Sequence, residues 1–194
     1  MRRGILLSLL LLPLASCTAP RGTAIQDVDR DHLMRNPLYA ERYWDDLTDR
    51  MVEIVLEEKD TLDARAMAAV DEVRRGALQQ AQEASRRKRE GIFGSFVSIK
   101  ETTLGIALLR GRTVSLSPDF ETSPGPNLHL ILTTMLDPRD GEFPDKTSVD
   151  AGGLESPYGA QEYALSESAT MEGLRTAVIY DTKLKRMYGF AQLQ

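Results

Sequence analysis

Thiols and imidazoles are scarce in this sequence. Its 194 residues include one cysteine, Cys17, and two histidines, His32 and His129. Beyond residue 17 there can be no disulfide, no cysteine zinc site and no cysteine nucleophile. The two histidines are far apart and lie in unlike contexts, which argues against a histidine-based metal site. We therefore expect neither a metal site nor a resident cofactor.

Common catalytic and nucleic-acid-binding patterns are missing as well. The sequence contains no glycine-rich phosphate loop, no Gly-x-Ser-x-Gly and no His-Glu-x-x-His. The adjacent carboxylates Asp45-Asp46 and Glu57-Glu58 fall in a helical segment, where neighbouring side chains diverge by about 100° and do not converge as an acid–base pair. The net charge is −5, without a dominant basic patch, so nucleic acid is not an expected partner. These absences favour a protein that is not an enzyme.

Long apolar runs are also absent, apart from residues 5–14. This run is shorter than the about 20 residues that a membrane-spanning helix needs. Arg2 and Arg3 precede it, and Leu14-Ala15-Ser16-Cys17 closes it. A charged start, an apolar middle and a small-residue end are typical of a secretory signal. A cysteine directly after the small residues makes the segment resemble a bacterial lipoprotein signal.

This resemblance implies a signal peptide over residues 1–16 and a mature chain whose first residue, Cys17, carries lipid on its thiol. The protein would then be held on a cell membrane, facing the periplasm or the exterior. Thr18 follows the cysteine, and this resembles the outer-membrane class of lipoproteins if the organism has an outer membrane. An ordinary secretory peptide and an N-terminal membrane helix remain alternatives.

We expect residues 17–36 to form a flexible tether and residues 37–90 to be helical. The first segment is polar and has no apolar period. Asn36 can cap a helix, and Pro37 suits its first turn. Within residues 37–90, mostly apolar residues recur at spacings of three or four positions and predict a narrow stripe on one side of a helix, with one charged member. The stripe consists of Leu47, Met51, Ile54, Glu58, Leu62, Ala66, Ala69, Val73 and Ala77.

Two helical arrangements fit this stripe. A single helix would be about 80 Å long at 1.5 Å per residue, whereas a break around residues 59–61, with Asp60 or Thr61 as the cap, would give a hairpin. The stripe passes through the candidate break in phase, which favours the single helix. Such a coiled-coil-like stripe needs a partner in water: the C-terminal domain, a second copy, or an envelope protein. The basic run of residues 86–89 complements the helix dipole.

From residue 91 onward the apolar period falls to two. Short strand-like runs alternate with turns rich in Gly, Pro, Asp and Ser, and Gly111-Arg112 predicts a hairpin turn. Many short strands without a strong helical pattern predict an antiparallel β-sandwich or barrel. The fold class expected for the whole chain is therefore α+β.

Several features of residues 91–194 occur in the order found in the DM-thirteen domain, an extracellular module often labelled "electron transfer DM-thirteen". They are Gly105 and Ala107, Asp119-Phe120, Gly125-Pro126-Asn127-Leu128, Val149-Asp150, Gly153-Leu154, Gly159-Ala160-Gln161-Glu162-Tyr163, and the closing strands around residues 177–180 and 188–193. This part of the chain resembles that family. The label implies a redox role.

The resemblance also implies a redox cysteine near residues 178–180, where this chain has Asp181. A carboxylate cannot supply thiolate chemistry, and Asp181 fits a turn between two strands. Tyr180 or Tyr188 could relay an electron, although strand tyrosines more often pack in a core. His129 is a candidate ligand only if a cavity opens beside its strand.

Two hypotheses follow from these patterns. The first is a membrane-anchored binding or interaction module that is not an enzyme. The second is an electron-transfer or cofactor-binding module, as the family label implies. An envelope hydrolase has no recognisable nucleophile and base to support it.

Overall fold

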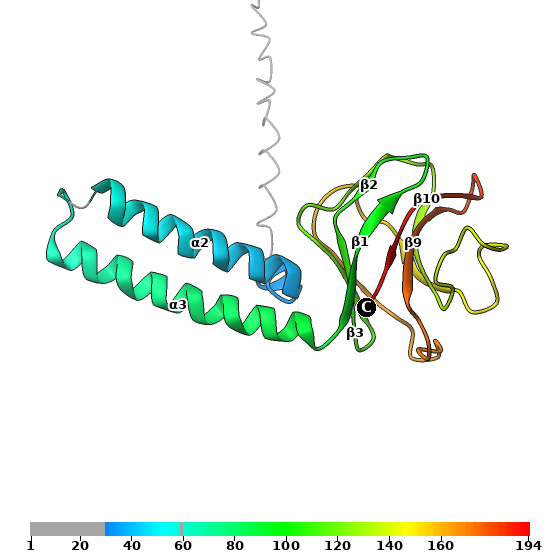
Figure 1. Cartoon of the computed structure of the whole chain (residues 1–194), viewed down its shortest axis with the longest axis horizontal. Coiled ribbons are helices and arrows are strands. Elements are labelled where there is room, and N and C mark those ends of the chain that lie inside the picture. The colour runs from blue at the N-terminus through cyan, green and yellow to red at the C-terminus, as the bar shows by residue number, and fades with distance from the viewer. Residues whose placement is uncertain (1–29, 59) are drawn as a thin grey trace, which may run out of the picture.

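The computed structural model describes residues 30–58 and 60–194 as a helical hairpin attached to a β domain (Figure 1). Helix α1 spans Arg30–Leu33, α2 spans Pro37–Glu58 and α3 spans Ala64–Arg89. The proposed signal peptide, Cys17 and most of the proposed tether lie outside the described residues. The last part of that segment forms α1 and a turn. No helix within the described ranges is long and apolar enough to cross a membrane.

The preference for one continuous helix over residues 37–90 was wrong, because α2 and α3 fold back on each other as a hairpin. The backbone N–H groups of Thr61 and Leu62 donate to the carbonyl of Glu58 and end α2. Asp63 has an extended backbone and accepts the N–H of Ala66 at 2.7 Å, so it caps α3 in place of Asp60 or Thr61. The apolar stripe keeps its helical period on both sides of the turn, because the stripe residues of α2 face α3 and those of α3 face α2.

Ten short strands follow the hairpin. They are β1 Ile92–Ser98, β2 Thr103–Leu104, β3 Ile106–Arg110, β4 Thr113–Leu116, β5 Glu121–Thr122, β6 Leu128–Thr133, β7 Val149–Gly153, β8 Gln161–Ala164, β9 Thr176–Asp181 and β10 Arg186–Gln192. Eight form one sheet in the order β7-β6-β9-β10-β1-β3-β4-β8, in which every pairing is antiparallel. The two end strands, β7 and β8, lie against each other, so the sheet curls into a nearly closed barrel. The α+β class and the antiparallel β domain are therefore confirmed.

The barrel has a main core inside and a smaller apolar cluster outside. Strand β9 supplies both, since Ala177 and Ile179 point into the main core while Val178 and Tyr180 point outward. Phe143, from the segment between β6 and β7, covers the outer cluster edge-on to Tyr180, with ring centroids 5.4 Å apart. All six residues of β9 are buried because both of its faces are covered.

The hairpin joins the β domain at its base through Asn36. The side-chain oxygen of Asn36 accepts the N–H groups of Leu38 and Tyr39, which is the cap expected for α2. The amide nitrogen of the same side chain donates to the carbonyl of Leu116 in β4 at 2.7 Å. One buried side chain thus starts the helix and holds it to the sheet.

The basic residues at the end of α3 hold the base of the hairpin together. Lys88 forms an ion pair with Glu41 of α2, with 2.6 Å between nitrogen and oxygen, and its ammonium lies 5.3 Å from the centre of the Phe93 ring. The guanidinium of Arg87 donates to the carbonyls of Met34 and Arg35. These contacts with the chain before α2 fix where the hairpin begins.

Candidate functional site

Asp181, His129 and Tyr180 come together where β6 and β9 pair. His129 is the register partner of Tyr180, and Leu128 is the partner of Asp181. Their side chains do not converge on one cavity. Asp181 is the last residue of β9 and its carboxylate binds the turn that follows, whereas His129 and Tyr180 lie on the outer face of the sheet.

The carboxylate of Asp181 is fully buried and bonded to backbone. One oxygen accepts the N–H groups of Lys183 at 2.9 Å and Leu184 at 2.8 Å, and the other accepts the N–H of Asn127 at 3.2 Å. Burial raises the pKa of Asp181, but the donors from Leu184, Asn127 and Lys183 outweigh it and leave the pKa below its ordinary value. Asp181 therefore stays ionised and organises the β9–β10 turn, the structural role expected from its position.

His129 belongs to a polar network on the outer face. Its Nδ1 lies 2.9 Å from Asp150 Oδ2, and its Nε2 lies 3.3 Å from the side-chain nitrogen of Asn127. The amide of Asn127 also donates to the hydroxyl of Thr182. These partners favour the tautomer in which Nδ1–H donates to Asp150 and Nε2 accepts from Asn127. Both ring nitrogens are thus engaged within the protein.

This network orients an imidazole but offers no reacting partner. The one hydroxyl in it, that of Thr182, forms its hydrogen bonds with Asn127, whereas the hydrogen-bond partners of His129 are Asn127 and Asp150. In the part of the chain that the structure describes, no three His, Cys, Asp or Glu side chains gather as a metal site. From the sequence, His129 was a candidate ligand whose hydrogen-bond partners were not predicted. Asn127 and Asp150 were nevertheless in the Gly-Pro-Asn-Leu and Val-Asp motifs that carry the family resemblance.

The strand tyrosines are packing residues in this structure. Tyr180 sits in the outer cluster, and burial followed by the charge of Asp181 raises its pKa. Tyr188 lies in the main core, where burial is again the largest cause of a raised pKa. Burial raises the pKa of Tyr163 to about 12. All three phenols therefore stay protonated at neutral pH.

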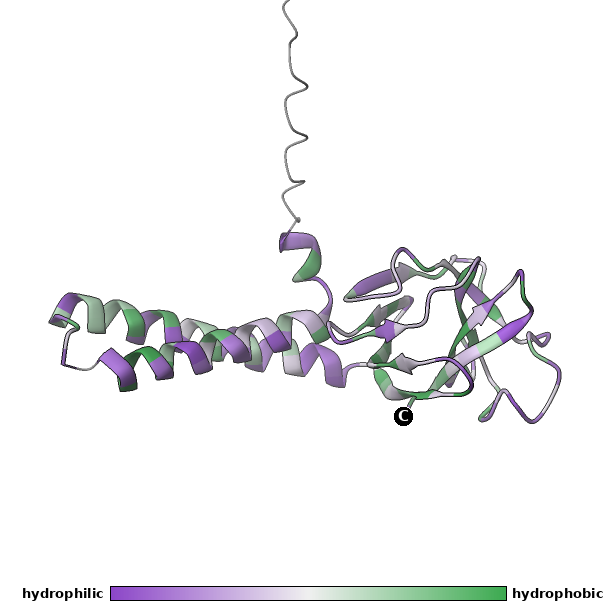
Figure 2. Ribbon diagram, turned by 90° about the horizontal axis from the view of Figure 1, so that it is seen from above, coloured by the Kyte–Doolittle hydropathy of each residue, from purple (hydrophilic) through white to green (hydrophobic). Residues whose placement is uncertain are grey.

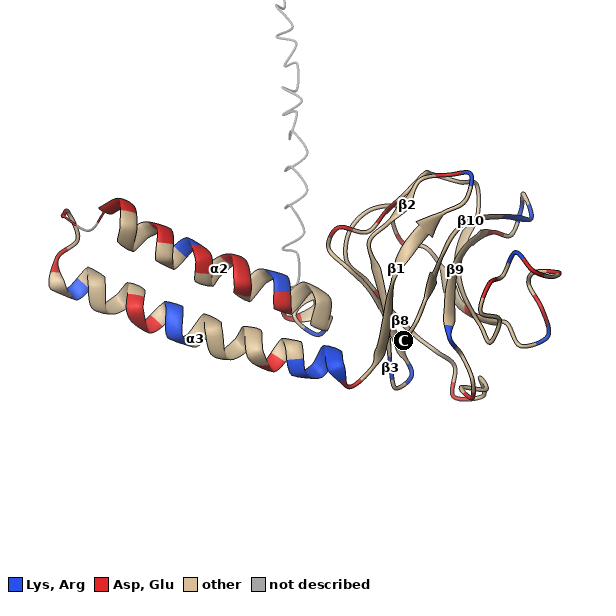
Figure 3. Cartoon of the chain, in the orientation of Figure 1, with Lys and Arg blue, Asp and Glu red and all other residues tan. Residues whose placement is uncertain are grey.

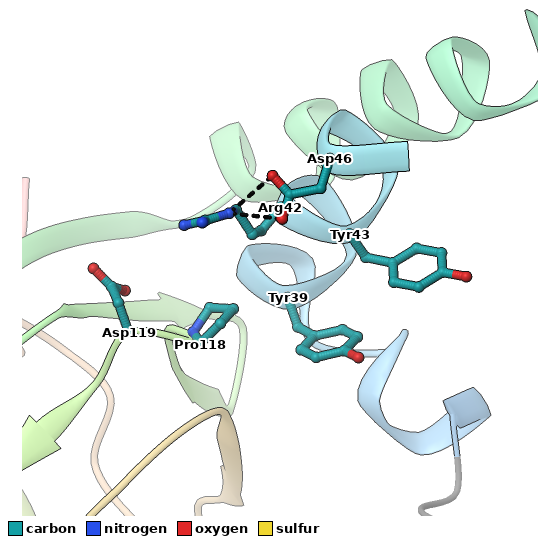
Figure 4. A pocket seen from close by; sticks show the side chains of 6 residues that line it. All are labelled: Tyr39, Arg42, Tyr43, Asp46, Pro118 and Asp119. Atoms are coloured by element: carbon teal, nitrogen blue, oxygen red, sulfur yellow. Dashed lines mark hydrogen bonds and ion pairs between the residues drawn. The ribbon is translucent and has the colours of Figure 1, made fainter. Parts of the chain in front are cut away.

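A shallow hollow of about 330 Å³ opens where α2 meets the loop between β4 and β5 (Figure 4). Tyr39 and Tyr43 stack along one side, with centroids 6.3 Å apart. On the other side the guanidinium of Arg42 lies between Asp46, which it contacts at 3.0 Å, and Asp119. Pro118 forms the floor between the two sides.

The surroundings of this hollow are acidic. Burial, and then the charges of Glu41, Asp49 and Asp46, raise the pKa of Asp45. Phenol faces next to carboxylates attract cationic groups, while no nucleophile and base meet here. The hollow has the character of a contact surface. The sequence did not predict it, because it joins segments about 75 residues apart.

Comparison with known proteins is consistent with the β domain described above. Residues 95–193 match the family described as Electron transfer DM13. No curated protein and no solved structure matches the chain. The match covers half of the sequence and nearly all of the β domain, from β1 to the residue after β10. The chain therefore belongs to the electron transfer DM13 family.

Proposed function

We propose that this protein is a lipid-anchored lipoprotein of the cell envelope whose DM13 domain and helical hairpin form a binding module without enzymatic activity. The observation that carries this proposal is the hairpin itself. It extends away from the β domain, and apolar residues, which are green in the ribbon of Figure 2, occur along both helices toward its tip. Among the described residues of the hairpin, buried ones occur only in the half nearer the β domain: Pro37, Leu38, Ala40, Ala77, Ala81 and Ala84.

Exposed apolar side chains support a role in contact with another molecule. Val52, Leu56, Val73 and Leu78 are 40%, 76%, 44% and 46% exposed. Val52, Leu56 and Leu78 lie outside the stripe that the two helices turn toward each other, so they stay in water unless another molecule covers them. The hydrogen bonds of Asp181 and His129 within the protein support the absence of catalysis.

Lipid anchoring is proposed from the Leu14-Ala15-Ser16-Cys17 sequence. We expect Cys17→Ser to abolish both labelling by a radioactive or clickable fatty acid and retention in the membrane fraction. Ser16→Ala is the matched control, because it keeps a small residue before the cysteine and should leave both readouts intact. Full membrane retention of Cys17→Ser would count against the proposal. Thr18 suggests the outer membrane as the destination if the organism has one.

Electron transfer is the second candidate function, and the family label is what favours it. Asp181 weakens it, because the position implied for a redox thiol holds a carboxylate fixed by three backbone donors. A visible absorption spectrum and metal analysis of natively purified protein separate the two candidates. A colourless, metal-free protein supports the binding module, while a stoichiometric chromophore would replace it with the redox function.

A further inference from the structure

One side of the hairpin carries most of its uncovered apolar surface. Helical period places Val52, Val55 and Leu56 on one flank of α2. In an antiparallel pair, the flank of α3 that faces the same way carries Met67 and Leu78. We call these five residues the open face. The β domain does not cover it, because α2 meets the domain near the base of the hairpin, at β4 and at the loop that follows β4.

The charges of the hairpin are divided between its two helices. Helix α2 carries seven acidic and two basic side chains, whereas α3 carries three acidic and seven basic ones. Figure 3 shows acidic residues along α2 and basic residues gathered toward the end of α3. Several pairs are satisfied within one helix, such as Arg42 with Asp46 and Arg74 with Asp71. Among the described residues, Asp49 of α2 and Arg75 of α3 have no ion-pair partner within 4 Å.

Because the two helices are antiparallel, Asp49 and Arg75 lie at about the same distance from the base of the hairpin. Glu41 and Lys88 meet near the base, and Glu58 and Asp63 mark the turn at the tip. Asp49 and Arg75 lie between these two points on their respective helices. They border the open face from opposite edges of the hairpin, so they do not pair with each other within one chain.

We propose that a second copy of this chain covers the open face, forming a four-helix bundle with a twofold axis along the hairpin. In that arrangement α2 of one copy lies against α3 of the other, and acidic and basic helices alternate around the bundle. Asp49 of each copy then faces Arg75 of the other across the edge of the apolar contact, as flanking charges do in coiled coils. A surface of anionic lipid fits less well, because acidic α2 forms half of the face.

A twofold axis along the hairpin also keeps both copies in the same orientation. Both chains then leave the bundle at its base toward one side, which suits two copies held in one membrane. This last point rests on the proposed lipid anchoring, while the contact between hairpins does not. Anchoring would raise the local concentration of copies and favour the pairing further.

Charge reversal tests the proposal on the full mature protein in density-matched detergent, with sedimentation equilibrium as the readout. We expect a dimer, and we expect Asp49→Arg and Arg75→Asp each to weaken it by about tenfold, because both edges of the bundle then carry like charges. An equimolar mixture of the two variants should recover the wild-type affinity, since each contact across the mixed pair again joins opposite charges. Glu167→Arg, an equal charge change on an exposed turn of the β domain, should leave the dimer unchanged.

Three outcomes overturn the proposal. They are a monomer at every concentration, a dimer that neither reversal weakens, and variants that remain monomeric after mixing although circular dichroism shows them folded. The first of these outcomes includes a monomer whose open face binds a different protein, which would leave the proposed binding module standing. Failure of lipid anchoring is read separately, from the membrane retention of Cys17→Ser, and does not affect sedimentation of the hairpin dimer.

Discussion

The chemistry of individual residues separates this chain from the redox role in its family label. The family resemblance implies a redox thiol near the end of β9, but Asp181 at that place is an acceptor for three backbone N–H groups. Gly125 lies close to it, and a methyl group at that glycine would come within 2.8 Å of the carboxylate. The surroundings of Asp181 are therefore built for a fixed anion in a turn.

Asp181 should make the protein sensitive to acid. Its pKa is lowered in the folded state, so its contribution to stability is fully present above the ordinary aspartate value of about 3.9 and is lost as the pH falls through the folded-state pKa. We expect Asp181→Asn to cost about 2 kcal/mol at pH 7 and to flatten the loss of stability below pH 4. Urea unfolding at several pH values measures both effects.

Asp119→Asn is the control for that experiment, because Asp119 is exposed on the loop between β4 and β5. It should change neither the stability at pH 7 nor its acid dependence. If the Asp181→Asn variant loses stability below pH 4 as steeply as the wild type does, another carboxylate is responsible for that loss. Asp145 would then be the next to test, since hydrogen bonds from Ser148, Thr147 and Thr133 outweigh its burial and lower its pKa.

At the scale of elements, the apolar period of the helical region could not distinguish one long helix from a hairpin. A stripe in phase across residues 59–63 is compatible with one helix and with a hairpin, because both use the same positions. What decides is the turn itself: the carbonyl of Glu58 accepts two N–H groups, and Asp63 caps the next helix. Folding back buries part of the stripe, whereas a single helix would bury none of it.

The cap of α3 can be tested with neighbouring aspartates. We expect Asp63→Ala to destabilise the protein by about 1 kcal/mol, because the N–H of Ala66 loses its acceptor. Asp60→Ala is the matched control and should have little effect, since Asp60 makes no capping contact. Thermal unfolding followed by circular dichroism at 222 nm compares the two variants. Equal losses would contradict the assignment of Asp63 as the cap.

At the scale of the whole molecule, Asn36 links the hairpin to the barrel. We expect Asn36→Ala to cost about 2–3 kcal/mol, because it removes both the cap of α2 and the donor to the buried carbonyl of Leu116. Asn36→Ser keeps a capping oxygen and should recover part of the loss. Urea unfolding gives the energies, and cleavage near the base by limited proteolysis reports release of the hairpin. Identical stability of all three proteins would refute this double role.

We also expect local unfolding to cost less free energy in the distal part of the hairpin than in the barrel. Backbone amides of β9 lie in a strand that is buried at every residue, whereas α2 beyond Ala40 and α3 before Ala77 contain no buried residue. Hydrogen exchange should therefore be slowest in β9 and fastest in the distal part of the hairpin. In a dimer, the distal helices should exchange more slowly as protein concentration rises. Uniform protection along the hairpin at low concentration would disagree with this picture.

The sequence by itself determined the α+β order of this protein, the series of short antiparallel strands after residue 91 and the cap at Asn36. These features follow from the local period of apolar residues, from turn residues and from backbone geometry, all of which depend on residues close together in the sequence. Tertiary structure alone decided that the helical region folds back, that His129 meets Asp150 and Asn127, and that Asn36 also binds the sheet. Each of these depends on which distant surfaces become buried together, and that information is not contained in any one segment of the chain.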